Sequence, residues 1–321
     1  MRLCGPQPVA FTMAVAKIWL TVAASIAIAE HIGAWWATAI AVFVIATRQS
    51  LLFLLVHEQI HFLGYKNRFG DLLVNLMCAY PVYFTTTEGY AQVHLIHHRH
   101  YFTDRDLDLK RKSGEEWAFP KPLTRLLRLF LRDLSGFNFI KLVRSKRTAK
   151  VEVTRRGYHP TWARRAFYLL LAATLTAVGG WRVFLVYWVL PLLTVLQVIV
   201  RWGAICEHEY NRPGARVSDS TPLILLPWWQ RLILPNLNWT MHLYHHYFPG
   251  IAFNRLPRVH ELFRAHGLVD EAAVFRGYGA YLRHLLKGPV SDVAALATVG
   301  IKPADHDVFS AIPTEVELAD I

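Results

Sequence analysis

Histidines recur in this sequence at spacings that suit shared metal ions. His57 and His61 are four residues apart, so on a helix both imidazoles lie on one face, with Cβ atoms about 6 Å apart. Residues 94–98 and 242–246 each carry histidine at their first, fourth and fifth positions, and His208 precedes the last group. The nine candidate ligands are His57, His61, His94, His97, His98, His208, His242, His245 and His246.

The number of imidazoles predicts more than one ion. Imidazole binds iron, zinc, copper and nickel, whereas a structural zinc takes about four ligands. Nine histidines therefore favour two irons with positions left open for O₂. Nearby carboxylates are expected to orient the imidazole N–H groups, although a solvated loop or a helix cap explains the aspartates equally well. These carboxylates are Asp104, Asp106, Asp108, Glu58, Glu207 and Glu209.

The composition predicts that these histidines belong to a membrane protein. Apolar residues make up 54% of the chain, charged residues only 18%, and the mean hydropathy is +0.25. A soluble surface needs more charge, and the 11 Trp and 13 Tyr suit the two bilayer interfaces. We expect one membrane domain over residues 1–302 and a polar tail over residues 303–321.

Four largely apolar stretches are the candidate membrane spans. A span needs about 20 apolar residues, and residues 30–33 form a tight turn between the first two candidates. Pro191 predicts a kink in the fourth, and the stretches 72–84 and 223–234 are too short to span. The expected fold is an all-α integral membrane protein of about four transmembrane helices with a cytosolic, histidine-rich cap. The spans are residues 9–29, 34–56, 164–178 and 181–201.

The basic residues predict the orientation of these spans. Between Arg99 and Arg165 lie 18 of the 35 Lys and Arg residues, and such loops stay in the cytoplasm. Residues 57–163 and the chain after residue 201 are then cytoplasmic. We therefore expect a multi-pass protein in which all nine histidines reach the cytoplasmic side of the bilayer.

The net charge of +12 does not indicate a nucleic-acid partner, because no RNA- or DNA-binding motif accompanies it. The basic loop could dock an acidic electron donor or anionic lipid headgroups, but membrane topology alone also explains it. The residues concerned include Lys141, Arg144, Lys146, Arg147 and Lys150. The cysteines Cys4, Cys78 and Cys206 form no CxxC motif and are too few for an iron–sulfur cluster.

The three histidine boxes resemble those of the membrane fatty-acid desaturase superfamily. The stretch 238–250, NWTMHLYHHYFPG, is especially similar to its third box, and Leu256, Pro257 and His260 continue the likeness. The resemblance covers residues 35 to 265. It implies two non-haem irons held by the box histidines, with His208 similar to an extra histidine after the last span. His100 departs from the pattern as an additional histidine beside the second box.

The resemblance also implies a reaction. Members use O₂ to remove hydrogen from an unactivated C–H bond, and we expect a desaturase acting on a fatty acyl chain or a lipid-like substrate. A hydroxylase or ketolase, or a desaturase of a small amphipathic, amino-acid-like metabolite, are alternatives. No catalytic residue beyond the metal ligands is predicted. The sequence shows no haem, flavin or ferredoxin motif, so electrons should come from a separate ferredoxin, cytochrome b5 or reductase.

Two non-enzymatic alternatives remain. A haem-binding membrane electron carrier would place facing His pairs inside its spans, whereas the clusters here lie beyond the span ends. A metal carrier would line its spans with polar residues, and Lys17, Arg48, Gln49 and Gln197 do not form such a path. The positions of the histidines therefore favour the oxygenase.

Overall fold

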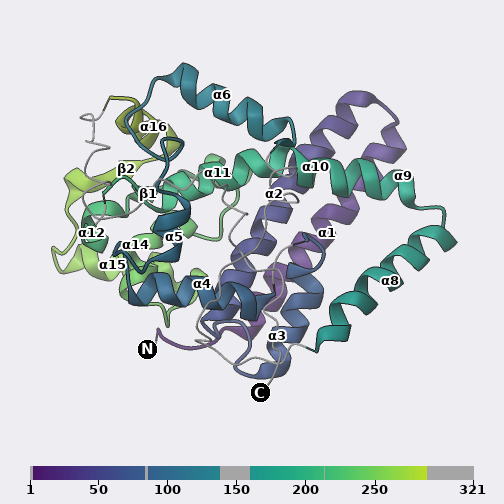
Figure 1. The fold of residues 1–321 in the computed structure, drawn as a ribbon, viewed down its shortest axis with the longest axis horizontal. Coiled ribbons are helices and arrows are strands. Elements are labelled where there is room, and N and C mark those ends of the chain that lie inside the picture. The colour runs from purple at the N-terminus through teal and green to yellow at the C-terminus, as the bar shows by residue number, and fades with distance from the viewer. Residues whose placement is uncertain (1–2, 84–85, 138–159, 213, 288–321) are drawn as a thin grey trace.

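The computed structural model describes residues 3–83, 86–137, 160–212 and 214–287. This part of the chain is mostly helical. Long helices gather on one side of the molecule, and shorter elements gather on the other, around α4 and α14 (Figure 1). The predicted C-terminal tail, residues 303–321, and the basic residues 141–150 lie outside the described residues, so both remain predictions.

The first two long helices form the predicted hairpin. They are α1, Pro8–Ile32, and α2, Trp35–Ile60. The prediction of a turn over residues 30–33 was wrong at its start, because α1 continues through Ile32. Gly33 ends the helix with φ 67°, and its N–H donates to the carbonyl of Ala29. Glycine adopts this left-handed conformation without a Cβ clash, so a two-residue turn suffices.

A third long helix runs from Trp181 to Glu207, with irregular turns on either side of Pro191. It consists of α9 (Trp181–Phe184), the π-turn η2 (Leu185–Val189), α10 (Leu190–Leu193) and α11 (Val195–Glu207). Proline lacks an N–H and disturbs the helix before it. Thr194, with φ −121° and ψ −90°, marks the break between α10 and α11. The irregularity predicted at Pro191 is thus present.

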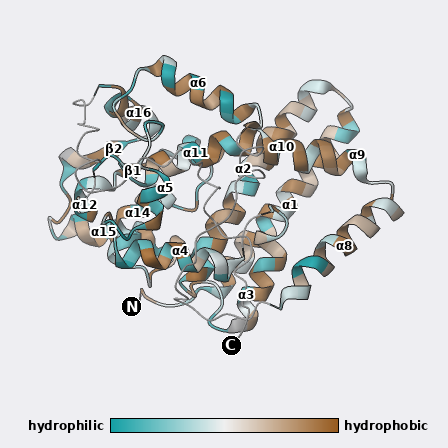
Figure 2. Cartoon of the chain, in the orientation of Figure 1, coloured by the Kyte–Doolittle hydropathy of each residue, from teal (hydrophilic) through white to brown (hydrophobic). Residues whose placement is uncertain are grey.

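Within the described residues, three helices are long and apolar enough to cross a membrane: α1, α2 and the helix from Trp181 to Glu207. The predicted third span corresponds to α8, Thr161–Ala177, whose 17 residues extend about 26 Å. That is shorter than a bilayer core of about 30 Å, so α8 falls outside this set. Several of its apolar side chains are nevertheless exposed, including Leu169 at 72% and Leu170 at 68%. Figure 2 shows apolar residues along all of these helices.

The remaining elements, which we call the head region, come from two parts of the sequence, one before α8 and one after α11. The first group comprises α3 (Arg68–Val74), the π-turn η1 (Asn75–Ala79), α4 (Thr87–Arg99), α5 (Leu107–Arg111) and α6 (Leu123–Leu134). The second comprises α12 (Val217–Ser220), β1 (Leu223–Leu225), α13 (Trp228–Ile233), η3 (Trp239–Met241), α14 (His242–Tyr247), η4 (Phe253–Arg255), α15 (Leu256–Ala265), η5 (Glu271–Ala273), β2 (Val274–Arg276) and α16 (Tyr278–Lys287).

Two contacts fix the ends of the long helices. The strands β1 and β2 pair in parallel, with Leu223 opposite Val274, and tie the chain after α11 to its C-terminal part. At the other end of the molecule, Arg182 at the start of α9 pairs with Glu30 near the end of α1. The helices α2 and α11 pack against α4 and η3 of the head region, and their C-terminal histidines therefore lie beside it.

Candidate metal centre

The histidines are positioned by four helix ends. His57 lies in the last turn of α2, and His61 caps that helix. His208 is the capping residue of α11. The second and third boxes lie on α4 and α14, two short helices of the head region. All of these segments meet at one place, as the spacing of the boxes predicted.

Eight of the nine imidazoles fall into two groups. The ligand atoms within each group lie within 4.8 Å of one another. The first cluster consists of His57, His61, His94, His98 and His245. The second cluster consists of His97, His208 and His246. His242 belongs to neither group, but its Nε2 lies 3.1 Å from Nε2 of His246, beside the second cluster.

Helix geometry explains how each box supplies both clusters. Successive residues of an α-helix point about 100° apart, whereas residues four apart point in nearly the same direction. On α4, His98 therefore shares the first cluster with His94, and its neighbour His97 turns to the second. On α14, His245 and His246 separate in the same way. The adjacent pair in each HxxHH box thus connects the two groups.

The separations between ring nitrogens suit metal ions better than hydrogen bonds. Nε2 of His94 lies 2.8 Å from Nε2 of both His57 and His98. A neutral ring nitrogen either donates or accepts one hydrogen bond, so at least one of these two contacts is not a hydrogen bond and brings like groups, two lone pairs or two N–H groups, toward each other. A cation between the nitrogens removes that repulsion.

The same separations indicate the coordination angle. Two nitrogens bound at right angles to one ion, each about 2.1 Å from it, lie about 3.0 Å apart, and at a tetrahedral angle about 3.4 Å apart. In the first cluster, His98 and His245 are 3.1 Å apart. In the second, His208 lies 3.2 Å from His97 and 3.1 Å from His246. These donor sets fit ions of high coordination number, such as iron, better than a tetrahedral zinc.

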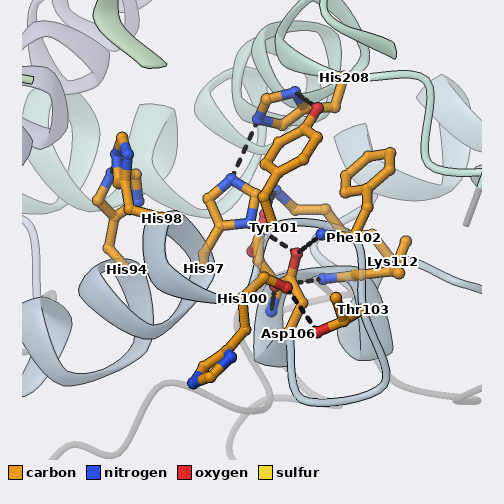
Figure 3. A network of polar contacts seen from close by, with 12 residues as sticks. His94, His97, His98, His100, Tyr101, Phe102, Thr103, Asp106, Lys112 and His208 are labelled. Carbon is orange, nitrogen blue, oxygen red and sulfur yellow. Dashed lines mark hydrogen bonds and ion pairs between the residues drawn. The ribbon is translucent and has the colours of Figure 1, made fainter. Parts of the chain in front are cut away.

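A buried carboxylate holds the second cluster in place. Asp106 is fully buried, and its Oδ2 lies 2.9 Å from Nδ1 of His97 and accepts a hydrogen bond from the N–H of Phe102. Its Oδ1 caps α5 through the N–H groups of Asp108 and Leu109. Figure 3 shows His97 between this carboxylate and His208. Such a contact fixes the ring so that Nε2 faces the metal site.

Two hydroxyl groups position His208 in the same way. Its Nδ1 lies 3.0 Å from Oγ1 of Thr221 and 3.2 Å from the hydroxyl of Tyr101, while Nε2 faces the second cluster. The hydroxyl of Tyr101 also contacts the hydroxyls of Ser220 and Thr221. Tyr101 follows His97 by four residues, which is a usable signal, but nothing in the sequence connects Thr221 with His208.

The other predicted carboxylates have different partners. Asp108 bonds to Lys112 and Tyr210, and Glu209 bonds to Arg212 and His284. Glu207 accepts a hydrogen bond from the indole of Trp239, and Glu58 accepts one from the N–H of Phe253. Asp104 is exposed. Glu58 Oε1 lies 3.9 Å from Nδ1 of His57, too far for a hydrogen bond. Among the six carboxylates, only Asp106 holds a box histidine at hydrogen-bond distance in the described structure.

Burial makes the imidazoles suitable as metal ligands. It lowers the pKa of His98 to about 2, and it holds the pKa of His208 and His245 well below the usual value, with further lowering from neighbouring histidines. Burial also acts to lower the pKa of His97, but the negative charge of Asp106 outweighs it and the pKa is raised. Neutral imidazoles keep the lone pair that a metal needs.

His100 does not join either cluster. It is the capping residue of α4, and its ring points away from the clustered histidines (Figure 3). Trp239, by contrast, packs against the first cluster, with its ring centroid 4.2 Å from that of His57 and 4.3 Å from that of His242. The histidine spacing gave no reason to single out Trp239.

A cavity of about 150 Å³ opens beside the first cluster. His57 and Trp239 line it at the cluster. Leu54 of α2 and Val200 of α11 contribute apolar side chains to its wall, and Arg111 is among the charged residues that line it. A substrate bound here would lie next to the first cluster.

Comparison with known proteins agrees with the geometry. The family model described as fatty acid desaturase matches residues 33–278, which include all nine candidate ligands and most of the described structure. The match indicates an oxidoreductase and, together with the apolar helices, a membrane protein. No significant match is found among curated proteins. The extent of the match shows that this chain belongs to the fatty acid desaturase family.

Proposed function

We propose that the protein is a membrane-bound, non-haem di-iron desaturase that uses O₂ to remove hydrogen from an unactivated C–H pair. The observation that carries the proposal is the division of the histidines into two adjacent, buried donor sets. The first cluster would hold one iron, and the second cluster with His242 would hold the other. Nine imidazoles suit iron and exceed what one zinc site requires.

The irons would supply the oxidising power that no amino-acid side chain has. The protein residues orient the ligand rings and exclude water from the metal centre. Asp106, Thr221 and Tyr101 hold the rings of His97 and His208. Trp239 covers one side of His57, and a substrate in the cavity would have a C–H bond beside the first cluster. Burial of the ligand rings excludes water, which protects a reactive centre from side reactions.

We further propose a four-span topology with the histidines on the cytoplasmic side. In this arrangement α8 joins the three longer helices as a membrane helix, the third along the chain. Local thinning of the bilayer would accommodate its short length. The exposed apolar side chains of α8 support this, because they would otherwise face water. The concentration of Lys and Arg between residues 99 and 165 supports the cytoplasmic placement.

The substrate is proposed to be a fatty acyl chain or a lipid-like molecule, and the electron donor a separate ferredoxin, cytochrome b5 or reductase. Family membership supports both proposals. Apolar walls from α2 and α11 also support an apolar substrate segment. Hydroxylation of the same C–H bond is the alternative outcome, since it starts from the same hydrogen abstraction.

The proposal is tested by turnover of purified protein reconstituted with reduced ferredoxin or with cytochrome b5 and its reductase. Mass spectrometry of added fatty acids, acyl esters and lipids should show products lighter by two hydrogens, formed only with O₂ and iron. Products heavier by one oxygen would replace desaturase by hydroxylase. A Soret band, or metal flux into vesicles without O₂ consumption, would contradict the oxygenase.

A further inference from the structure

One wall of the cavity beside His57 is formed by α2. Thr47, Ser50, Leu54 and His57 line it from α2 at intervals of three or four residues, so they share one face of the helix. Ten residues of α-helix extend about 15 Å. The opposite wall comes from α11. The cavity therefore follows α2 from the first cluster toward the part of the molecule that faces the bilayer.

Charged residues also line the cavity, and most of these charged groups pair with one another. Lys112 Nζ lies 2.9 Å from Oδ2 of Asp108, 2.6 Å from the hydroxyl of Tyr210 and 3.6 Å from Oε2 of Glu207. Oε1 of Glu207 accepts a hydrogen bond of 2.6 Å from Trp239. Lys112 and the two carboxylates thus have partners within the protein.

Arg111, another charged residue of the cavity wall, is less completely paired. Its side chain is 6% exposed, and Oδ1 of Asp108 lies 3.6 Å from its Nη1, beyond hydrogen-bond distance. Its Nε has no hydrogen-bond partner among the residues that the structure describes. A guanidinium remains charged at any physiological pH, and burying it without full pairing is costly. Arg111, which lines the cavity, therefore has an N–H group that can still donate a hydrogen bond.

We propose that Arg111 binds a free carboxylate of the substrate, while the apolar part of the same molecule passes His57 and lies between α2 and α11. Identifying this ligand as the substrate rests on the proposed function. A guanidinium and a carboxylate match as two parallel hydrogen bonds. An ester or a thioester lacks the charge, so this pairing selects a free acid over an activated acyl chain.

The size of the cavity agrees with a compact ligand. About 150 Å³ is the volume of an engineered cavity that holds benzene. Only a short segment is enclosed, and the carboxylate at Arg111 fixes which carbon atoms that segment contains. Arg111 thereby acts as a positioning residue that determines where along the chain hydrogen is removed.

The test compares octanoate with methyl octanoate, which differ by the charge and one methyl group. Equilibrium binding of each radiolabelled ligand is measured on the full-length protein in neutral phosphatidylcholine nanodiscs, with empty nanodiscs subtracted. Wild type should bind octanoate about tenfold or more tightly than the ester. Arg111→Gln should remove this preference. Arg105→Gln, a matched change at an exposed arginine of the same segment, should retain it.

Equal binding of acid and ester by the wild type, or an unchanged preference in Arg111→Gln, would overturn the inference. Arg111→Lys keeps the charge without the forked geometry and should retain part of the preference, which guards against a folding defect in Arg111→Gln. Iron content measured on the same samples separates the two proposals. A preference for the acid in protein that cannot hold iron supports this inference and contradicts the di-iron function, and two irons without the preference do the reverse.

Discussion

The two histidine clusters are built from the same boxes but are held in different ways. In the second cluster, Nδ1 of His97 and of His208 each contact an oxygen of Asp106, Thr221 or Tyr101. In the first cluster, Nδ1 of His57 has no hydrogen-bond partner in the described structure, and its ring packs on Trp239 beside the cavity. Hydrogen bonds to Nδ1 hold rings of the second cluster, whereas packing beside the cavity holds His57 of the first.

This difference indicates a division of labour between two metal positions. Hydrogen bonds to Nδ1 fix ring orientation and raise ligand basicity, which suits an ion that stays in place. Apolar packing leaves room for a substrate and excludes water. We therefore expect changes around the second cluster to act first on metal content, and changes around the first cluster to act first on turnover.

The largest effect should come from removing a ligand of either cluster. His245→Ala and His246→Ala alter adjacent residues of α14 that serve different clusters. Each should reduce turnover to background and lower iron content, because each ion loses a donor. His31→Ala, an exposed histidine of α1, is the control and should change neither. Full activity in either ligand variant would remove that cluster from the account.

A smaller loss is expected from Asp106→Asn. The substitution keeps the size of the side chain but removes the charge beside His97, and such outer contacts contribute roughly 10- to 100-fold to metal affinity. Iron should dissociate more readily in a chelator titration, with Asp104→Asn as the exposed control. Because Asp106 also caps α5, thermal unfolding of the metal-free protein is measured alongside. Unchanged iron retention would mean that His97 needs no orienting carboxylate.

The two hydroxyl groups at His208 should give a smaller effect still. Thr221→Val and Tyr101→Phe each remove one oxygen from its Nδ1, and either residue can compensate for the other. We expect a loss of iron affinity of a few-fold for each single variant and a greater than additive loss for the double variant, since hydrogen bonds contribute about 1 kcal/mol each. Purely additive losses would show that the hydroxyls act independently.

The smallest effect on metal content should come from Trp239→Phe. Phenylalanine keeps an aromatic ring beside His57 but cannot donate to Glu207. Turnover should fall several-fold, while iron per chain stays at the wild-type value. If iron is lost as well, the first cluster depends on this indole as strongly as the second depends on its hydrogen bonds, and the proposed division fails.

The ligand candidates could be predicted because helix periodicity operates at short range. The spacing in residues 94–98 and 242–246 places the rings on nearby faces, and it already contains the divergence of the adjacent histidines by about 100°. Asp106 was one of six carboxylates expected to orient imidazoles, because it follows the second box closely. These features need only local backbone geometry, which the residue types in α4 and α14 specify.

Other features depend on contacts between distant segments and could not be predicted. Thr221 reaches His208 through a turn after α11, and Arg111 meets the cavity because α5 packs beside α4. Among the long helices, hydropathy predicted α1 and α2 well, but α8 begins at Thr161 and is shorter than a full span. The boundary of α1 was misplaced because Glu30 and His31, though polar, continue the helix to Gly33.

The most direct test of the central claim is the metal content of the purified wild-type chain, measured by plasma mass spectrometry together with an optical spectrum. The account predicts about two irons per chain and no Soret band, with His245→Ala and His246→Ala each retaining about one. A single zinc per chain, or a haem spectrum, would contradict it, because the two donor sets would then serve a different chemistry.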